Sequence, residues 1–137
     1  MILDAIAAHL AAAGLGLTEG TNLFKSILPD SPDACVAIFE TPGRASTKAF
    51  GTTIQFENAR FQILARSSRE SLVSGAYSTA RSLADSIYVK LDGAGNLTLS
   101  GIKYLYIEAL QTPFQLERDE NHRAIICCNY ETQKAVG

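Results

Sequence analysis

Residue types that hold metals or carry redox chemistry are scarce in this chain of 137 residues, which has three cysteines and two histidines. An odd number of cysteines, two of them adjacent at Cys127 and Cys128, makes no disulfide framework and fits a reducing compartment. A structural zinc site usually needs about four convergent ligands, with pairs separated by about two to four residues. Neighbouring residues of a strand point to opposite faces, so we expect this cysteine pair to be structural.

Excess charge of either sign is also missing. Twelve Lys and Arg residues against 14 Asp and Glu residues leave a formal net charge of −2. A chain without a general basic field has little capacity for sequence-independent binding to DNA or RNA, and we predict no direct sequence-specific nucleic-acid binding either. The apolar residues 1–17 include Asp4 and His9, lack a basic leader and are too short to span a bilayer. We therefore expect a mature, soluble protein with no membrane partner.

Catalytic signatures are absent by every pattern that we compared. The chain has no G-x-S-x-G elbow, and the glycines at 93–95 follow an expected helix, whereas a phosphate-binding loop follows a strand. A nucleophilic cysteine needs a base, but His9 is expected on the polar side of the first helix. The consecutive acids Asp119 and Glu120 are best explained as solvated turn residues. No enzyme activity, cofactor or metal is predicted.

Two helices are predicted from apolar periodicity. The first has Ile2, Leu3, Ile6, Leu10 and Ala13 on one face and ends at Gly14, which suits a left-handed C-cap. The second starts at a capping box formed by Ser67 and Glu70 and ends before Gly93. Its apolar stripe consists of Leu72, Ala76, Ala80, Leu83, Ile87 and Leu91.

Strands are predicted in the remaining segments. They cover residues 24–28, 35–40, 54–65, 97–99, 102–111 and 124–131, with a turn at 29–32, a polar loop at 44–51 and a two-residue hairpin link at Ser100-Gly101. The apolar parity of the strand 54–65 slips near 57–59, which predicts a β-bulge that lets both halves face one core. In the last strand, Ala124, Ile126, Cys128 and Tyr130 share one face. The length and a hydrophobic fraction of 47% then predict a single α+β domain, residues 1–137, with an antiparallel or mixed sheet and two main helices packed on it.

Three short segments are characteristic in their order and spacing along the chain. They are Pro29-Asp30-Ser31-Pro32-Asp33, the strand end at 111–114, and Arg118-Asp119-Glu120-Asn121 followed by Arg123. None is a catalytic signature. Together with the first helix and the strand-helix unit that ends in IYVKLDG, their order and spacing resemble the minor capsid or tail-terminator family of long-tailed phages over nearly the whole chain. In that family a glycine-like turn residue is common where His122 stands.

The resemblance implies a structural virion protein that is assembled in the host cytoplasm. Copies would close a hexameric ring on a finished tail tube, stop its polymerisation and present a surface for head-tail joining. The expected partners are other copies of the chain, the tail-tube protein and the head connector or neck protein. Two alternatives stay open: a head-side connector or stopper protein, and a small cytosolic metal- or thiol-dependent enzyme that uses Cys127, Cys128 and His122.

Candidate interface residues follow from the resemblance. In the turn 117–123, the charged residues Arg118, Asp119, Glu120 and Arg123 are candidates for contacts with other subunits or the tube. In the loop 44–51, Arg44, Lys48 and Phe50 are candidates for an arm that reaches a partner. An exposed ion pair contributes only about 0–1 kcal/mol to stability. The alternative interpretation of each of these residues is therefore a solvated loop residue that contacts no partner.

Overall fold

The structure of the protein is a computed structural model that describes residues 2–48, 54–69 and 75–135. Its elements, in chain order, are α1 (Ile2–Ala11), β1 (Leu23–Lys25), β2 (Cys35–Lys48), β3 (Ile54–Arg66), α2 (Ala76–Leu91), β4 (Ala94–Leu99), β5 (Ile102–Ala109), β6 (Phe114–Arg118) and β7 (Ala124–Ala135). Neither described helix is long and apolar enough to cross a membrane.

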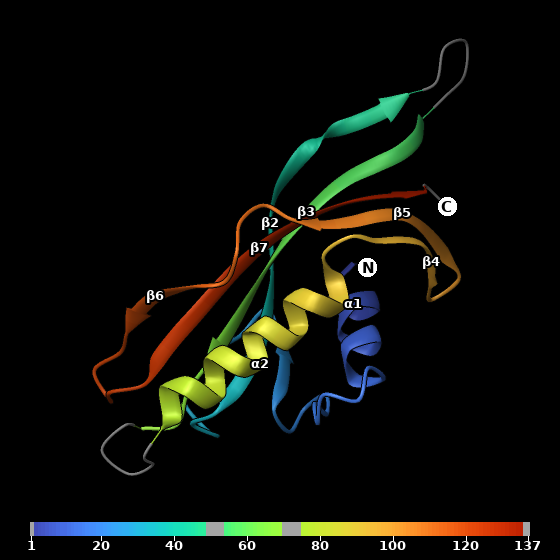
Figure 1. Cartoon of the computed structure of the whole chain (residues 1–137). Helices are drawn as coiled ribbons and strands as arrows, with labels where there is room; N and C mark the ends of the chain where they lie inside the picture. Colours follow the sequence, from blue (N-terminus) through green and yellow to red (C-terminus); the bar gives the residue numbers. More distant parts are fainter. Residues whose placement is uncertain (1, 49–53, 70–74, 136–137) are drawn as a thin grey trace.

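One mixed sheet of seven strands organises the molecule (Figure 1). The strand order is β1-β2-β3-β7-β5-β4, and β6 pairs with β7 off this path. The β1–β2 pair is parallel, and the other pairs are antiparallel. On one side β7 pairs with β3, and on the other side it pairs first with β6 and then with β5. The predicted α+β class with two helices on a mixed sheet is confirmed.

The main core lies between the sheet and the two helices, and we call this side of the sheet the helical face. The predicted inward residues of β7 are confirmed: Ala124, Ile126, Cys128 and Tyr130 are all buried there. The rings of Tyr130 and Phe61 stack with their centroids 5.2 Å apart. Burial of apolar area contributes roughly 25 cal/mol per Å², so this layer supplies most of the stabilisation.

The opposite side, which we call the open face, has a smaller apolar cluster. Leu64, Ile125 and Cys127 are buried there, and Leu28 and Phe39 pack against them. The two adjacent cysteines therefore lie on opposite faces of the sheet, as the alternation of a strand requires. Neither of the two described helices lies on the open face, so among the described residues the segment that carries Leu28 covers this cluster.

The predicted start of the second helix is wrong. The chain remains extended in β3 through Arg66, and α2 begins at Ala76 after Gly75, which has a left-handed φ of 75°. The hydroxyl of Ser67 accepts a hydrogen bond from the N–H of Ala124 at 2.8 Å, so it extends the β3–β7 pairing where a helix cap was expected. Glu70 and Leu72, the other residues of the predicted start, lie outside the described residues.

The predicted bulge in β3 is also wrong, and so is the predicted loop over residues 44–48; residues 49–51 of that loop lie outside the described residues. From Phe56 to Arg66, β3 pairs with β7 without a register shift, and the irregularities lie in the β2–β3 pairing around 41–48. A Cβ at Gly43 would lie 2.3 Å from the carbonyl oxygen of Asn58, which explains why glycine occupies the bulged segment. The strand β2 continues to Lys48, so Arg44 and Lys48 lie in a strand.

Turn residues were predicted better than strand ends. Ser100 and Gly101 have φ values of 52° and 79°, which confirms the tight link between β4 and β5. The strand β1 spans only Leu23–Lys25 because Ser26 has a left-handed φ of 64°. The strand β6 was not predicted: all five of its residues are exposed, so it has none of the apolar alternation that marks a half-buried strand.

Truncation of a core residue of β7 tests the helical face. Ile126 has an exposed fraction of 0%, so Ile126→Ala should lower the free energy of unfolding by about 2–5 kcal/mol through lost contacts and a cavity. Val89→Ala on the exposed side of α2 should change it by less than about 0.5 kcal/mol. Urea denaturation followed by circular dichroism measures both, and equal effects of the two variants would contradict this description of the core.

Candidate functional site

A buried arginine joins the two polar segments of the sequence that stand about 90 residues apart. The side chain of Arg123, the residue directly before β7, is only 4% exposed. Its Nε donates to Asp119 Oδ2 at 2.8 Å, its Nη2 to Asp30 Oδ1 at 3.0 Å and its Nη1 to Asp33 Oδ1 at 3.0 Å. We call these four residues the Arg123 cluster. A buried guanidinium needs such charge-assisted partners, because an unpaired buried charge is strongly unfavourable.

A second buried arginine holds the same loop. Arg66, at the end of β3, donates through Nε to the carbonyl oxygen of Asp33 at 2.8 Å. Its Nη2 donates to the carbonyl oxygens of Pro32, at 2.8 Å, and Pro29. The loop 29–33 is therefore fastened to the open face by two arginines from neighbouring strands. The two prolines and two aspartates of the sequence motif Pro29-Asp30-Ser31-Pro32-Asp33 act here as a structural joint.

Asp119 also shapes the turn between β6 and β7. Its Oδ1 accepts hydrogen bonds from the backbone N–H groups of Asn121 at 2.9 Å and Arg123 at 3.0 Å. Burial raises the pKa of this carboxyl, but the hydrogen bonds from Arg123 and Asn121 outweigh that effect and leave its pKa below the ordinary value. His122 has a left-handed φ of 60°, the backbone conformation that a glycine-like turn residue adopts.

The four candidates of this turn divide into two kinds. Arg118 and Glu120 are exposed, and Arg118 Nη1 reaches only the nearby carbonyl oxygen of His122 at 3.3 Å. Asp119 and Arg123 face each other inside the chain. A role for all four in contacts with other subunits stays a prediction, but the internal pair already has its charges compensated within the chain.

The other candidate segment is the outer half of the β2–β3 hairpin. Arg44 Nε donates to Glu131 Oε1 at 2.8 Å, and Arg60 Nη2 approaches the same oxygen at 3.3 Å. The Glu131 side chain is only 8% exposed, whereas that of Arg44 remains 54% exposed. The end of β2 brings Lys48 to the same outer part of the hairpin, and Phe50 lies outside the described residues. The base of the predicted arm is therefore a β-hairpin formed by β2 and β3.

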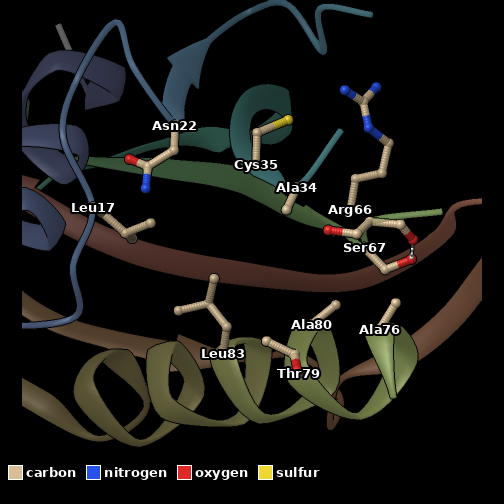
Figure 2. Close-up of a pocket in the computed structure, with 11 residues that line it drawn as sticks. Leu17, Asn22, Ala34, Cys35, Arg66, Ser67, Ala76, Thr79, Ala80 and Leu83 are labelled. Carbon is tan, nitrogen blue, oxygen red and sulfur yellow. Dashed lines mark hydrogen bonds between the residues drawn. The ribbon is translucent and has the colours of Figure 1, made fainter. Parts of the chain in front are cut away.

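An apolar hollow beside α2 shows no catalytic arrangement. A cavity of about 150 Å³ lies between the start of α2 and the beginning of β2 (Figure 2). Its described lining is mostly apolar, with Leu17, Cys35 and Leu83 among its members, and includes no histidine or carboxylate. Burial raises the pKa values of the Cys35, Cys127 and Cys128 thiols, which makes each a poor nucleophile at neutral pH.

Metal binding by the candidate thiols has no geometric support in the part of the chain that is described. Among those residues, no group of three or more His, Cys, Asp or Glu side chains is arranged to hold an ion. His9 is half-buried, and burial together with the nearby Lys90 lowers its pKa.

Sequence reasoning missed several residues that build the site. Asp30 and Asp33 were noticed only as part of a motif, and Arg66 and Glu131 were not singled out. A usable signal existed for one of them: Arg66 ends an apolar strand segment, where an unpaired charge would be unfavourable. Its partners are backbone carbonyls of a loop about 35 residues away, and no local pattern identifies those.

Loss of the buried guanidinium should weaken the joint. Arg123→Met removes the charge-assisted hydrogen bonds to three carboxylates, so we expect the free energy of unfolding to fall by about 1.5–3 kcal/mol. Arg123→Lys should restore part of this loss. Arg81→Met, in an exposed pair with Asp85, is the control and should have little effect. Equal stabilities of Arg123→Met and Arg81→Met in urea denaturation would contradict this role of Arg123.

Acid should loosen the same joint. The folded-state pKa of Asp119 lies below the ordinary value of 3.8, so the ionised group stabilises the fold above about pH 4, and this contribution disappears as the pH falls through the folded-state pKa. Asp119→Asn should therefore flatten the fall in unfolding free energy between about pH 5 and pH 2. Denaturation at a series of pH values measures the slope, with Asp85→Asn as control. A slope in Asp119→Asn equal to that of the unmodified chain would refute the assignment.

Comparisons with known proteins agree with this architecture. A solved chain from "Virion of native gene transfer agent (GTA) particle" superposes with a TM-score of 0.68 at 17% identity, covering 98% of this chain and 95% of that chain. A second solved chain has a TM-score of 0.52 at 13% identity, covering 96% of this chain and 90% of that chain. At such identities the likeness concerns the fold alone. A search of curated proteins found no match.

The family comparison goes further. A family model described as "Bacteriophage tail terminator protein" matches residues 9–136, which is nearly the whole chain. The predicted resemblance is thereby confirmed. The chain belongs to the bacteriophage tail terminator family and is a structural, non-enzymatic component of the virion tail.

Proposed function

We propose that copies of this chain close a hexameric ring on the end of a finished tail tube, where the ring stops tube polymerisation and offers the surface for head-tail joining. The observation that carries the proposal is the family match over residues 9–136. As a virion component, the chain works together with other phage structural proteins. The proposed partners are further copies of the chain, the tail-tube protein and the head connector or neck protein.

The shape of the molecule suits a head-to-tail ring. The β6–β7 turn and the outer part of the β2–β3 hairpin lie at opposite ends of the sheet (Figure 1). Two unlike surfaces at opposite ends allow each copy to contact a neighbour on either side, and such heterologous contacts close into a ring when the rotation between copies permits it. We propose that residues 1–137 act as one unit in this assembly.

The candidate residues take distinct parts in the proposal. Arg118 and Glu120 are exposed on the turn and supply charge contacts with a partner. Asp119 and Arg123 hold that turn in place from inside the chain. Arg44 and Lys48 belong to the hairpin arm at the other end, and Phe50, which lies outside the described residues, remains a candidate of the same segment. Charges at the rim of such interfaces mainly set register and exclude wrong partners.

A charge exchange on the turn tests the proposal. Arg118→Glu with Glu120→Lys keeps the net charge and should leave the fold intact, because both residues are exposed, but it should disturb the contact with the partner. Compared with the unmodified chain, we expect fewer capped tubes in electron micrographs of the purified variant mixed with tail tubes. We also expect a smaller fraction of the variant in rings when the mass of the oligomers is measured in solution. The matched control is Arg81→Glu with Asp85→Lys on α2, which should cap tubes normally.

The outcomes separate the roles. Normal capping by the Arg118→Glu, Glu120→Lys variant would remove these two residues from the interface. An unmodified chain that binds no tube but binds head connectors would refute the tail-tube role and favour a head-side connector. Failure of the unmodified chain to form a ring, with tail tubes and with head connectors alike, would refute the proposal as a whole.

A further inference from the structure

The strand β6 carries a concentration of exposed apolar side chains. Large apolar residues exposed in the described part of the chain are Ile27, Val89, Leu110, Phe114 and Leu116. Three of these lie within residues 110–116, with exposed fractions of 45% for Leu110, 37% for Phe114 and 48% for Leu116. Apolar groups that gather on one surface of a soluble protein commonly mark a site of interaction with another protein.

The backbone of β6 is also available to a partner. On one side β6 pairs with β7, and no strand of the described chain pairs with its other side. All five residues of β6 are exposed. A free edge of this kind presents unpaired N–H and C=O groups and can accept a further strand. The register shift between Gln115 and Glu117 limits the regular part of this edge to a short stretch.

A matching edge lies at the other end of the molecule. The strand β1 covers only Val36, Ala37 and Ile38 of β2, and β2 continues to Lys48. Among the described strands, none pairs with the side of residues 39–48 that faces away from β3; we call this side the distal edge of β2. Figure 1 shows β6 and the distal part of β2 at opposite ends of the sheet. Two such edges can meet between neighbouring copies in a head-to-tail arrangement.

Charge favours the same pairing. Glu117 on β6 is exposed and negative. Near the distal edge of β2, Arg44 and Arg60 share the single carboxylate of Glu131, so this trio carries one positive charge in excess. Within the edge itself, the charges of the exposed Glu40 and of Lys48 offset each other, so the excess remains. The edge of β4 is a poorer partner, because Asn96 in its middle has a left-handed φ of 54° that interrupts the extended backbone. A second copy of this chain thus offers both an unpaired edge and the complementary charge.

We infer that β6 of one copy docks along the distal edge of β2 in a second copy, which covers Phe114 and Leu116 and brings Glu117 near Arg44. This inference rests on the proposed ring and assigns the contact between its neighbouring copies. The Arg123 cluster has a positioning role in it, because Asp119 directly follows β6 and is held to the loop 29–33 through Arg123. The buried joint thereby sets the direction in which β6 leaves the body of the molecule.

Cysteine cross-linking tests which edges meet. The three natural cysteines are buried in the structure, so mild oxidation should spare them. A double variant, Glu117→Cys with Arg44→Cys, should form a ladder of covalent oligomers on a non-reducing gel when incubated with tail tubes. Arg60 still pairs with Glu131 in this variant, so the buried carboxylate keeps a partner. Each single variant, and Val89→Cys with Arg44→Cys, should give no ladder.

Two results would overturn the assignment. Efficient dimers of the single variant Glu117→Cys would indicate that β6 meets β6 in a symmetric pair. Rings that form with the double variant but show no cross-links would place the contact elsewhere.

Removal of the apolar side chains gives an independent test. Phe114→Ser with Leu116→Ser should raise the concentration needed for ring formation by about tenfold or more, since burial of such side chains favours association. The thermal unfolding temperature should change little, because both residues are exposed. The matched control is Ile27→Ser with Val89→Ser, two exposed apolar residues outside the proposed contact.

The readouts distinguish this inference from the proposed function. Rings of the Phe114→Ser, Leu116→Ser variant at the concentration of the unmodified chain would overturn the docking of β6 and leave the ring proposal standing. Absence of rings from the unmodified chain would overturn the proposed function. In that case the cross-linking of two copies in concentrated solution still decides whether β6 meets the distal edge of β2.

Discussion

The guanidinium of Arg123 is the interaction on which the arrangement of the polar segments depends. It is nearly removed from solvent and has carboxylate partners from two parts of the chain, Asp119 beside it and the loop that holds Asp30 and Asp33. A buried charge of this kind is tolerated only with well-placed partners, so the loop and the β6–β7 turn must take up one mutual position. Arg66 adds hydrogen bonds to the loop carbonyls from the next strand.

The two faces of the sheet differ in how much apolar surface they bury. The helical face buries the continuous apolar layer that includes the stacked rings of Phe61 and Tyr130. The open face has a small apolar cluster beneath the loop and polar side chains such as Arg44, Arg60 and Glu131 further out. The β6–β7 turn and the outer β2–β3 hairpin are unlike ends of this sheet, which is what the proposed ring requires.

Structural features that depend only on residues close in the sequence were predicted well. The inward residues of β7, the Ser100-Gly101 link and the end of the first helix near Gly14 follow from alternation and from left-handed backbone positions, which are local properties. Predictions that needed a distant partner were wrong. Ser67 looked like a helix cap, but its hydroxyl is used by Ala124 of the neighbouring strand. The slip in parity of β3 looked like a bulge, but the irregularity lies in its partner β2.

The sequence by itself determined the α+β class, the alternating face of the last strand and the resemblance to a tail-terminator family. These features follow from the spacing of apolar residues and the order of motifs, which are properties of the linear chain. Only the tertiary structure decided which charged residues are internal and which are exposed. Arg118 and Arg123 have the same charge and stand five residues apart, yet one is exposed and the other is buried among aspartates. That difference depends on a loop about 90 residues away, and contacts between distant segments exist only in the folded chain.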